Sequence, residues 1–126
     1  MTQAEQAVLI WPVLALAART QRVLTYADVE GFTGILARAQ GEPLLLIHRY
    51  CERKHYPLLN SIVVSQDTGF PGEAFPNNMT PIEFLVERAR VFGSNWSAKD
   101  KPRSEDFEAS ESATEIPEPR RPKNLI

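Results

Sequence analysis

Cysteine and histidine are scarce in this sequence: Cys51 is the single cysteine among 126 residues, and His48 and His55 are the two histidines. One cysteine excludes an intramolecular disulfide, so we expect the fold to depend on a hydrophobic core in a reducing cytoplasm. Cys51 falls on the apolar side of its helix and is expected to be buried. The two histidines are seven residues apart, with no Asp, Glu or Cys completing a metal-site geometry, so we predict no metal and no cofactor.

Patterns that carry catalysis are also missing. No Ser-His-acid arrangement, carboxylate pair or glycine-rich phosphate loop stands out, and we predict that the protein is not an enzyme. The formal net charge of −2 gives no overall attraction to nucleic acid, so a DNA-binding surface would have to be a local basic patch. The uncharged run at residues 7–18 is too short to span a bilayer, which takes about 20 residues, and no membrane partner is predicted.

That uncharged run belongs to a predicted first helix, which extends from Gln3 toward Arg19 after a capping pattern at Thr2 and Glu5. Pro12 lies inside it, so we expect a kink or break there. Apolar side chains cover much of its circumference, which implies burial on more than one side. A homodimer through residues 7–18 is therefore one expectation.

The middle of the chain predicts a short helix from Thr25 to Gly34 and a second helix at residues 43–54 with a mostly basic outer face that includes His48. A β-branched run at residues 58–65 then reaches a glycine turn at residues 67–69, which suggests a strand and a small β wing. Two helices followed by a wing are the order of a winged helix-turn-helix. The predicted fold class is mainly α with a small β wing.

A further helix is predicted from Thr80 to Gly93, where Pro81 and Glu83 give a strong start signal. Its core-facing stripe is expected to be Ile82, Leu85, Val86, Ala89 and Phe92, and Trp96 is expected to fold back onto the core. From Ser97 onward hydrophobic residues are scarce, while Pro, Ser and Glu are abundant. We therefore predict a winged-helix-like domain at residues 1–96 and an acidic, flexible tail at residues 97–126.

Residues 23–75 resemble the DNA-binding domain of the alkylguanine-DNA alkyltransferases and the alkyltransferase-like proteins. Thr25-Tyr26 matches the Thr/Ser-Tyr pair that opens a helix in that family, and residues 37–41 (ARAQG) match its Ala-Arg-Ala-Val-Gly segment. Residues 59–64 (LNSIVV) align with its Pro-Cys-His-Arg-Val-Val strand. The resemblance implies that Tyr26 turns a backbone phosphate and that Arg38 enters the base stack beside an extruded nucleotide. Asn60 stands at the acceptor cysteine, and an amide is no nucleophile, so alkyl transfer is not implied.

The candidate DNA-binding residues are Tyr26, Arg38, Arg49, Arg53 and Lys54. Each has a plainer interpretation, because arginines and lysines often lie on a solvated helix face and tyrosines often pack between helices. Two functions remain open. The first is a non-catalytic protein that binds double-stranded DNA as an alkyltransferase-like sensor or regulator. The second is a protein-interaction module, such as an immunity protein or inhibitor in a bacterial toxin or phage-defence system, whose acidic tail meets a basic partner.

Overall fold

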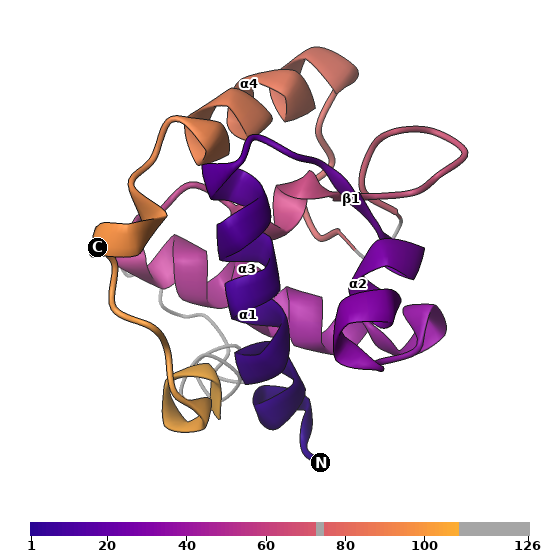
Figure 1. The fold of residues 1–126 in the computed structure, drawn as a ribbon. Coiled ribbons are helices and arrows are strands. Elements are labelled where there is room, and N and C mark those ends of the chain that lie inside the picture. The colour runs from indigo at the N-terminus through magenta and orange to yellow at the C-terminus, as the bar shows by residue number, and fades with distance from the viewer. Residues whose placement is uncertain (73–74, 109–126) are drawn as a thin grey trace, which may run out of the picture.

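The computed structural model describes residues 1–72 and 75–108, and the larger part of the expected acidic tail, residues 109–126, lies outside the described residues. The described residues are mainly α-helical with one small parallel sheet, which confirms the helical class (Figure 1). The elements are α1 (Gln3–Arg19), β1 (Leu24–Thr25), α2 (Tyr26–Thr33), η1 (Ala37–Ala39), α3 (Gly41–Lys54), η2 (Leu59–Ile62), β2 (Val63–Val64), α4 (Pro81–Phe92) and η3 (Trp96–Ala98). Residues 104–108 are also helical.

Three helices begin where the sequence predicts, at capping boxes. In each one a threonine hydroxyl accepts the backbone N–H of the third helical residue, whose carboxylate accepts the N–H of the threonine in return. These reciprocal pairs satisfy amide groups that the first turn of a helix leaves without a partner. The pairs are Thr2 with Glu5 for α1, Thr25 with Asp28 for α2, and Thr80 with Glu83 for α4.

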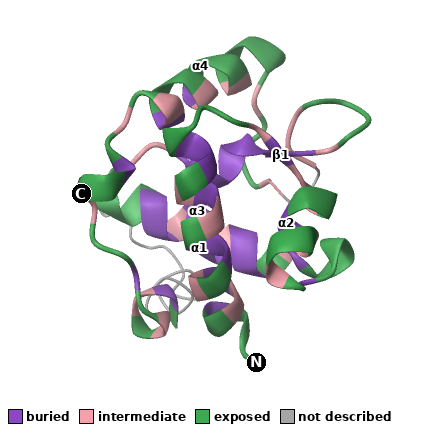
Figure 2. Cartoon of the chain, in the orientation of Figure 1, coloured by how far each residue is buried: buried purple, intermediate pink, exposed green. Residues whose placement is uncertain are grey.

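The core lies between α1 and α3, which cross in Figure 1 with α1 in front. Figure 2 shows the buried residues gathered on their facing sides. Trp11 of α1 meets Tyr50 of α3 edge to face, with ring centroids 5.6 Å apart. Of the kink or break expected at Pro12, the break does not occur, since α1 is continuous through it. Pro12 is exposed, while the buried neighbours Ile10, Trp11 and Leu14 hold both halves of the helix against the core.

The expected strand at residues 58–65 is mostly a different structure. Its first half forms the 3₁₀ turn η2, and only Val63–Val64 form a strand, which pairs in parallel with Leu24–Thr25. Ile62, Val63 and Val64 are all buried, so the run enters the core instead of forming a hairpin with one wet face. A loop follows, closed by a hydrogen bond from the Ser65 N–H to the Phe70 carbonyl, and no second strand follows it among the described residues.

Helix α4 is rotated relative to the orientation predicted from its apolar residues. Ile82, Leu85 and Val86 are 73%, 50% and 56% exposed, whereas Glu87 and Val91 are buried, so the predicted core stripe is wrong apart from Phe92, which packs half-buried against the core. Glu87 is drawn inward because its carboxylate accepts the backbone N–H of Leu58 at 2.7 Å, within the buried start of η2. A buried N–H without a partner is costly, and this bond decides which side of α4 faces the protein.

The packed part of the chain continues past the boundary expected at residue 96. Trp96 is buried, as predicted, and its indole N–H donates to the Val91 carbonyl at 2.7 Å. Phe107 is also fully buried, with ring centroids 5.4 Å from Tyr50 and 6.3 Å from Trp11. The residues after Trp96 thus supply one of the largest side chains of the core.

Candidate functional site

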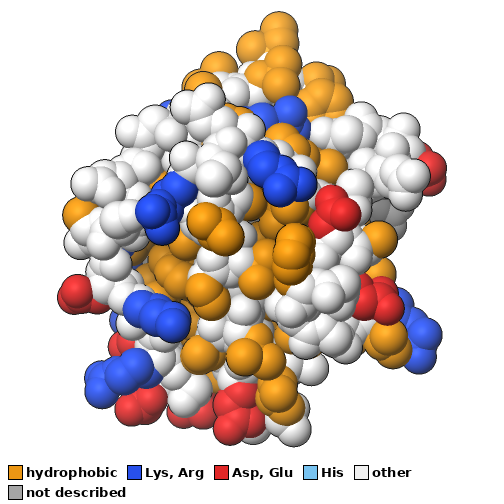
Figure 3. Space-filling view, viewed as in Figure 1, with side chains coloured by type: hydrophobic (Ala, Val, Ile, Leu, Met, Phe, Trp, Pro, Cys, Tyr) orange, Lys and Arg blue, Asp and Glu red, His pale blue; other side chains and the backbone are white. Residues whose placement is uncertain are grey.

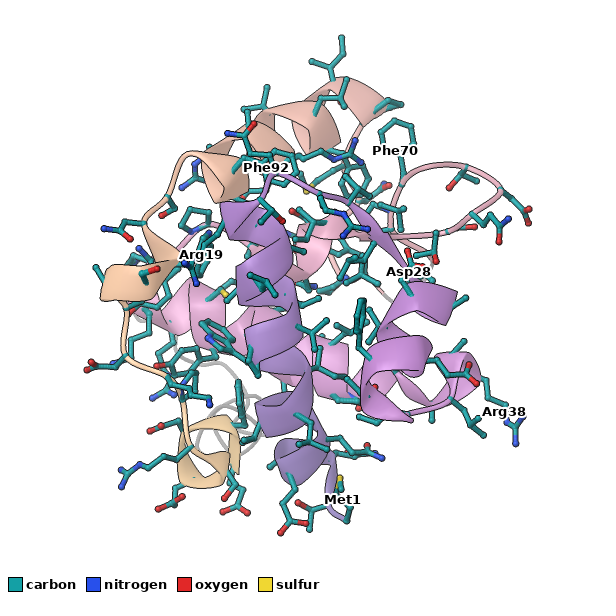
Figure 4. The ribbon with its side chains drawn as sticks, in the orientation of Figure 1. Met1, Arg19, Asp28, Arg38, Phe70 and Phe92 are labelled. Atoms are coloured by element: carbon teal, nitrogen blue, oxygen red, sulfur yellow. The ribbon has the colours of Figure 1, made fainter. Side chains whose placement is uncertain are left out.

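The turn between α2 and α3 presents Arg38 to solvent. Gly34 ends α2 in the left-handed conformation, with φ of 78°, and Glu30 accepts the backbone N–H of Ala37 at 3.0 Å. Gln40 is fully buried and its amide donates to the carbonyls of Tyr26 and Ile35 at 2.9 and 3.0 Å. These bonds fix η1 against α2, and the side chain of Arg38 extends away from the body (Figure 4).

Arg38 has no hydrogen-bond, ion-pair or ring partner within the part of the chain that the structure describes. The fold itself therefore makes no use of its guanidinium, which keeps five N–H donors for a ligand. The nearby carboxylate of Glu30 lowers the positive potential around this turn. Arg38 is better placed to make a specific contact than to attract phosphates at long range.

Tyr26, the first residue of α2, joins this turn to the loop after β2. Its hydroxyl accepts the backbone N–H of Gly72 at 2.9 Å. A Cβ at Gly72 would lie 3.2 Å from that oxygen, so glycine permits the close approach. Tyr26 is thus half-buried against the core, and its hydroxyl proton can still be donated.

A small cavity lies behind Tyr26. It has a volume of about 20 Å³, and its walls come from α2, α3 and η2, together with Pro71 and Phe75. The lining residues are Tyr26, Gly41, Leu44, Leu45, Asn60, Pro71 and Phe75. A space of this size holds roughly one water molecule. Asn60 is buried there, and its side-chain oxygen has no partner among the described residues.

His48 is buried next to Asn60, which corrects its expected place on the basic outer face of the helix. The Asn60 amide donates to Nδ1 of His48 at 3.2 Å, so the neutral ring carries its proton on Nε2, 3.4 Å from a carboxylate oxygen of Glu52. The Phe75 ring packs edge-on against it, with centroids 4.9 Å apart. Burial lowers the pKa of His48, and the charge of Glu52 opposes that shift only in part.

The other three candidate residues lie further along α3. Arg49 is half-buried, while Arg53 and Lys54 are exposed in the last turn and lie 5.5 and 5.8 Å from the centroid of the Tyr50 ring. Arg53 also donates to the Asp106 carbonyl at 3.0 Å. The 14 residues of α3 span about 21 Å, so the structure brings Tyr26 near the turn of Arg38 and separates both from Arg53 and Lys54.

Cys51 is buried, as expected, and desolvation raises the pKa of its thiol to about 12. A thiol with that pKa stays protonated at neutral pH and is a poor nucleophile. Within residues 1–72 and 75–108, no three His, Cys, Asp or Glu side chains gather as metal ligands would. None of the described helices is long and apolar enough to cross a bilayer.

The chain matches no protein-family model, no curated protein and no solved structure. The geometry of the site is therefore the basis for a functional argument. The burial of the polar residues Gln40, His48 and Asn60 was not predicted from the sequence. A glutamine inside an apolar turn and an asparagine before a β-branched run are unusual, and these two signals could have indicated buried polar side chains.

Proposed function

We propose that the chain is a non-catalytic DNA-binding protein that contacts duplex DNA with the α2–η1–α3 segment, as an alkyltransferase-like sensor or regulator. The observation that carries the proposal is Arg38, which is exposed, without a partner among the described residues, and held on a turn fixed by buried hydrogen bonds. A cation on a rigid support loses little entropy when it binds. The resemblance over residues 23–75 assigns that position to insertion into the base stack.

The order of the elements supports a winged helix-turn-helix arrangement. α2 and α3 are joined by the single turn η1, and the loop at residues 65–70 follows β2 where a wing would stand. In such an arrangement α3 is the helix presented to the groove. The phosphate contacts then fall to Tyr26 at one end, and to Arg49, Arg53 and Lys54 toward the other.

The proposed binding depends little on bulk charge. The net charge of −2 and Glu30 beside the turn leave only weak attraction for phosphates. A duplex site where base stacking is already weakened is therefore a better target than intact duplex. Unstacking costs least at a mismatched or damaged base. Because the cavity at Asn60 holds about one water, an extruded base would require Pro71 and Phe75 to move apart. Asn60 and the protonated thiol of Cys51 offer no nucleophile, which supports the non-catalytic part of the proposal.

Binding to matched and mismatched short duplexes across a salt series tests this function. Arg38→Ala is expected to lower the preference for the mismatched duplex by about 5- to 10-fold, on the order of 1 kcal/mol. Arg103→Ala, which removes a similar exposed charge far along the chain from this turn, is the matched control. Arg49→Ala and Arg53→Ala are expected to weaken binding to both duplexes alike and to reduce the salt slope by about one unit each. Absence of salt-sensitive binding by the wild-type protein at physiological ionic strength would refute the proposal.

A protein-interaction module is the second candidate, and the exposed stripe of Ile82, Leu85 and Val86 on α4 favours it. Figure 3 shows hydrophobic side chains over α4 at the top of the molecule. An immunity protein or inhibitor would use such a patch against its target, with the acidic tail facing a basic partner. Recovery of a partner that Leu85→Glu or deletion of residues 109–126 releases, together with no DNA binding, would favour this function.

A further inference from the structure

The outer face of α1 carries a regular seam that the fold leaves uncovered. Exposed residues recur along the helix at alternating spacings of four and three, which is the periodicity of a coiled-coil seam. Leu9 is 42% and Leu16 is 57% exposed, although α1 buries its opposite side. The seam consists of Glu5, Leu9, Pro12, Leu16 and Arg19.

The seam is nearly symmetric about its middle residue: the same residue types stand on both sides, except that the two ends carry opposite charges. Pro12 stands at the middle, Leu9 and Leu16 flank it, and the ends are Glu5 and Arg19. In an antiparallel pair with a two-fold axis at Pro12, Leu9 of one copy lies opposite Leu16 of the other. The same axis sets Glu5 opposite Arg19 of the second copy on both sides. A parallel pair would instead place like charges together at each end.

The surface beside the seam has hollows for the two leucines. Next to Leu16 is a hollow of about 90 Å³, lined in part by Val13, Leu24 and Phe32, and Phe32 is 66% exposed. Next to Leu9 is a wider one of about 650 Å³, lined by Met1, Val8 and residues 101–105 among others. In Figure 3 the apolar side chains form the middle of this face. Each leucine of a second copy thus meets a depression beside its counterpart.

From the opposite end charges, the mirrored leucines and these hollows, we infer that the seam of α1 binds a second copy of this chain in an antiparallel, two-fold arrangement. This association is independent of the proposed DNA binding. The helix face measures about 25 by 10 Å, so it covers on the order of 250 Å² per copy, well below the roughly 800 Å² per partner of a stable complex. The dimer is therefore weak and forms at micromolar concentrations or above.

Sedimentation velocity of the full chain at rising concentration, without DNA, tests the inference. Leu9→Glu and Leu16→Lys alone are each expected to weaken association at least about 30-fold, because each sets a charge against an apolar side chain twice in the dimer. The double variant is expected to associate about tenfold more tightly than either single one, since Glu at position 9 then faces Lys at position 16 of the other copy. Within one helix these positions are about 10 Å apart, too far to pair.

Two further variants complete the design. Glu5→Gln keeps a residue that can complete the capping box and removes the charge, so it is expected to weaken the dimer about 2- to 30-fold without unfolding α1. Leu85→Glu, at an equally exposed leucine on α4, is the control and is expected to leave association unchanged. A monomer at all concentrations, a dimer lost only with Leu85→Glu, or a double variant no tighter than the single ones would overturn the inference.

Discussion

Replacing Phe107 with alanine tests whether the residues after Trp96 belong to the folded core. The side chain is fully buried against Tyr50 and Trp11, so its removal leaves a cavity beside these two aromatic rings. Such Phe→Ala changes cost about 3–5 kcal/mol, and we expect the low end, near 3 kcal/mol, because a chain segment close to the surface can relax into the space. For a domain of this size the melting temperature would fall by roughly 12 °C.

Urea denaturation and thermal melting followed by tryptophan fluorescence measure this loss, since Trp11 contacts the Phe107 ring. Phe32→Ala is the matched control, because that ring is 66% exposed and its loss should change stability by less than about 0.5 kcal/mol. A fragment ending at residue 108 should melt like the full chain, and one ending at residue 96 should not. If Phe107→Ala lies within about 1 kcal/mol of the wild type and the shorter fragment melts normally, the core ends at Trp96 as the sequence alone suggested.

Two buried polar residues, His48 and Gln40, yield further predictions. Burial holds the pKa of His48 below its ordinary value of 6.5, so the folded state takes up this proton less readily than the unfolded state. The free energy of unfolding should therefore fall as the pH drops below about 6.5, with a slope of at most about 1.4 kcal/mol per pH unit. Urea titrations at several pH values should show a shallower acid loss for His48→Gln than for the His55→Gln control, and equal slopes would contradict this cause. Gln40→Leu keeps the side-chain volume but removes the amide that donates to the carbonyls of Tyr26 and Ile35, so we expect the free energy of unfolding to fall by about 2 kcal/mol. The exposed control Gln66→Leu should change it by less than about 0.5 kcal/mol. Similar values for both variants would show that the turn does not depend on Gln40.

Sequence alone determined where three of the helices begin and where α2 ends, whereas α3 begins at Gly41, two residues before the predicted start. The starts of α1, α2 and α4 depend on a threonine and a carboxylate three residues apart, and Gly34 ends α2. These signals are readable because both partners of each hydrogen bond lie within one helical turn. The burial of Cys51 and Trp96 was also predictable, since apolar side chains leave water wherever the chain permits. Of the candidate site, the exposure of Arg38, Arg53 and Lys54 was predictable.

Tertiary structure decided which faces of those helices meet the core. Glu87 turns inward for the N–H of Leu58, which is 29 residues away, and this exposes the apolar stripe of α4. Val63–Val64 pair with Leu24–Thr25 from a distant part of the chain, and His48 is buried because Asn60 and Phe75 come to meet it. Hydrophobic periodicity cannot foresee such contacts, because it records the preference of one element and not the partners that other segments bring. A buried N–H or imidazole must find its partner wherever the fold supplies one, and that choice overrides the apolar pattern.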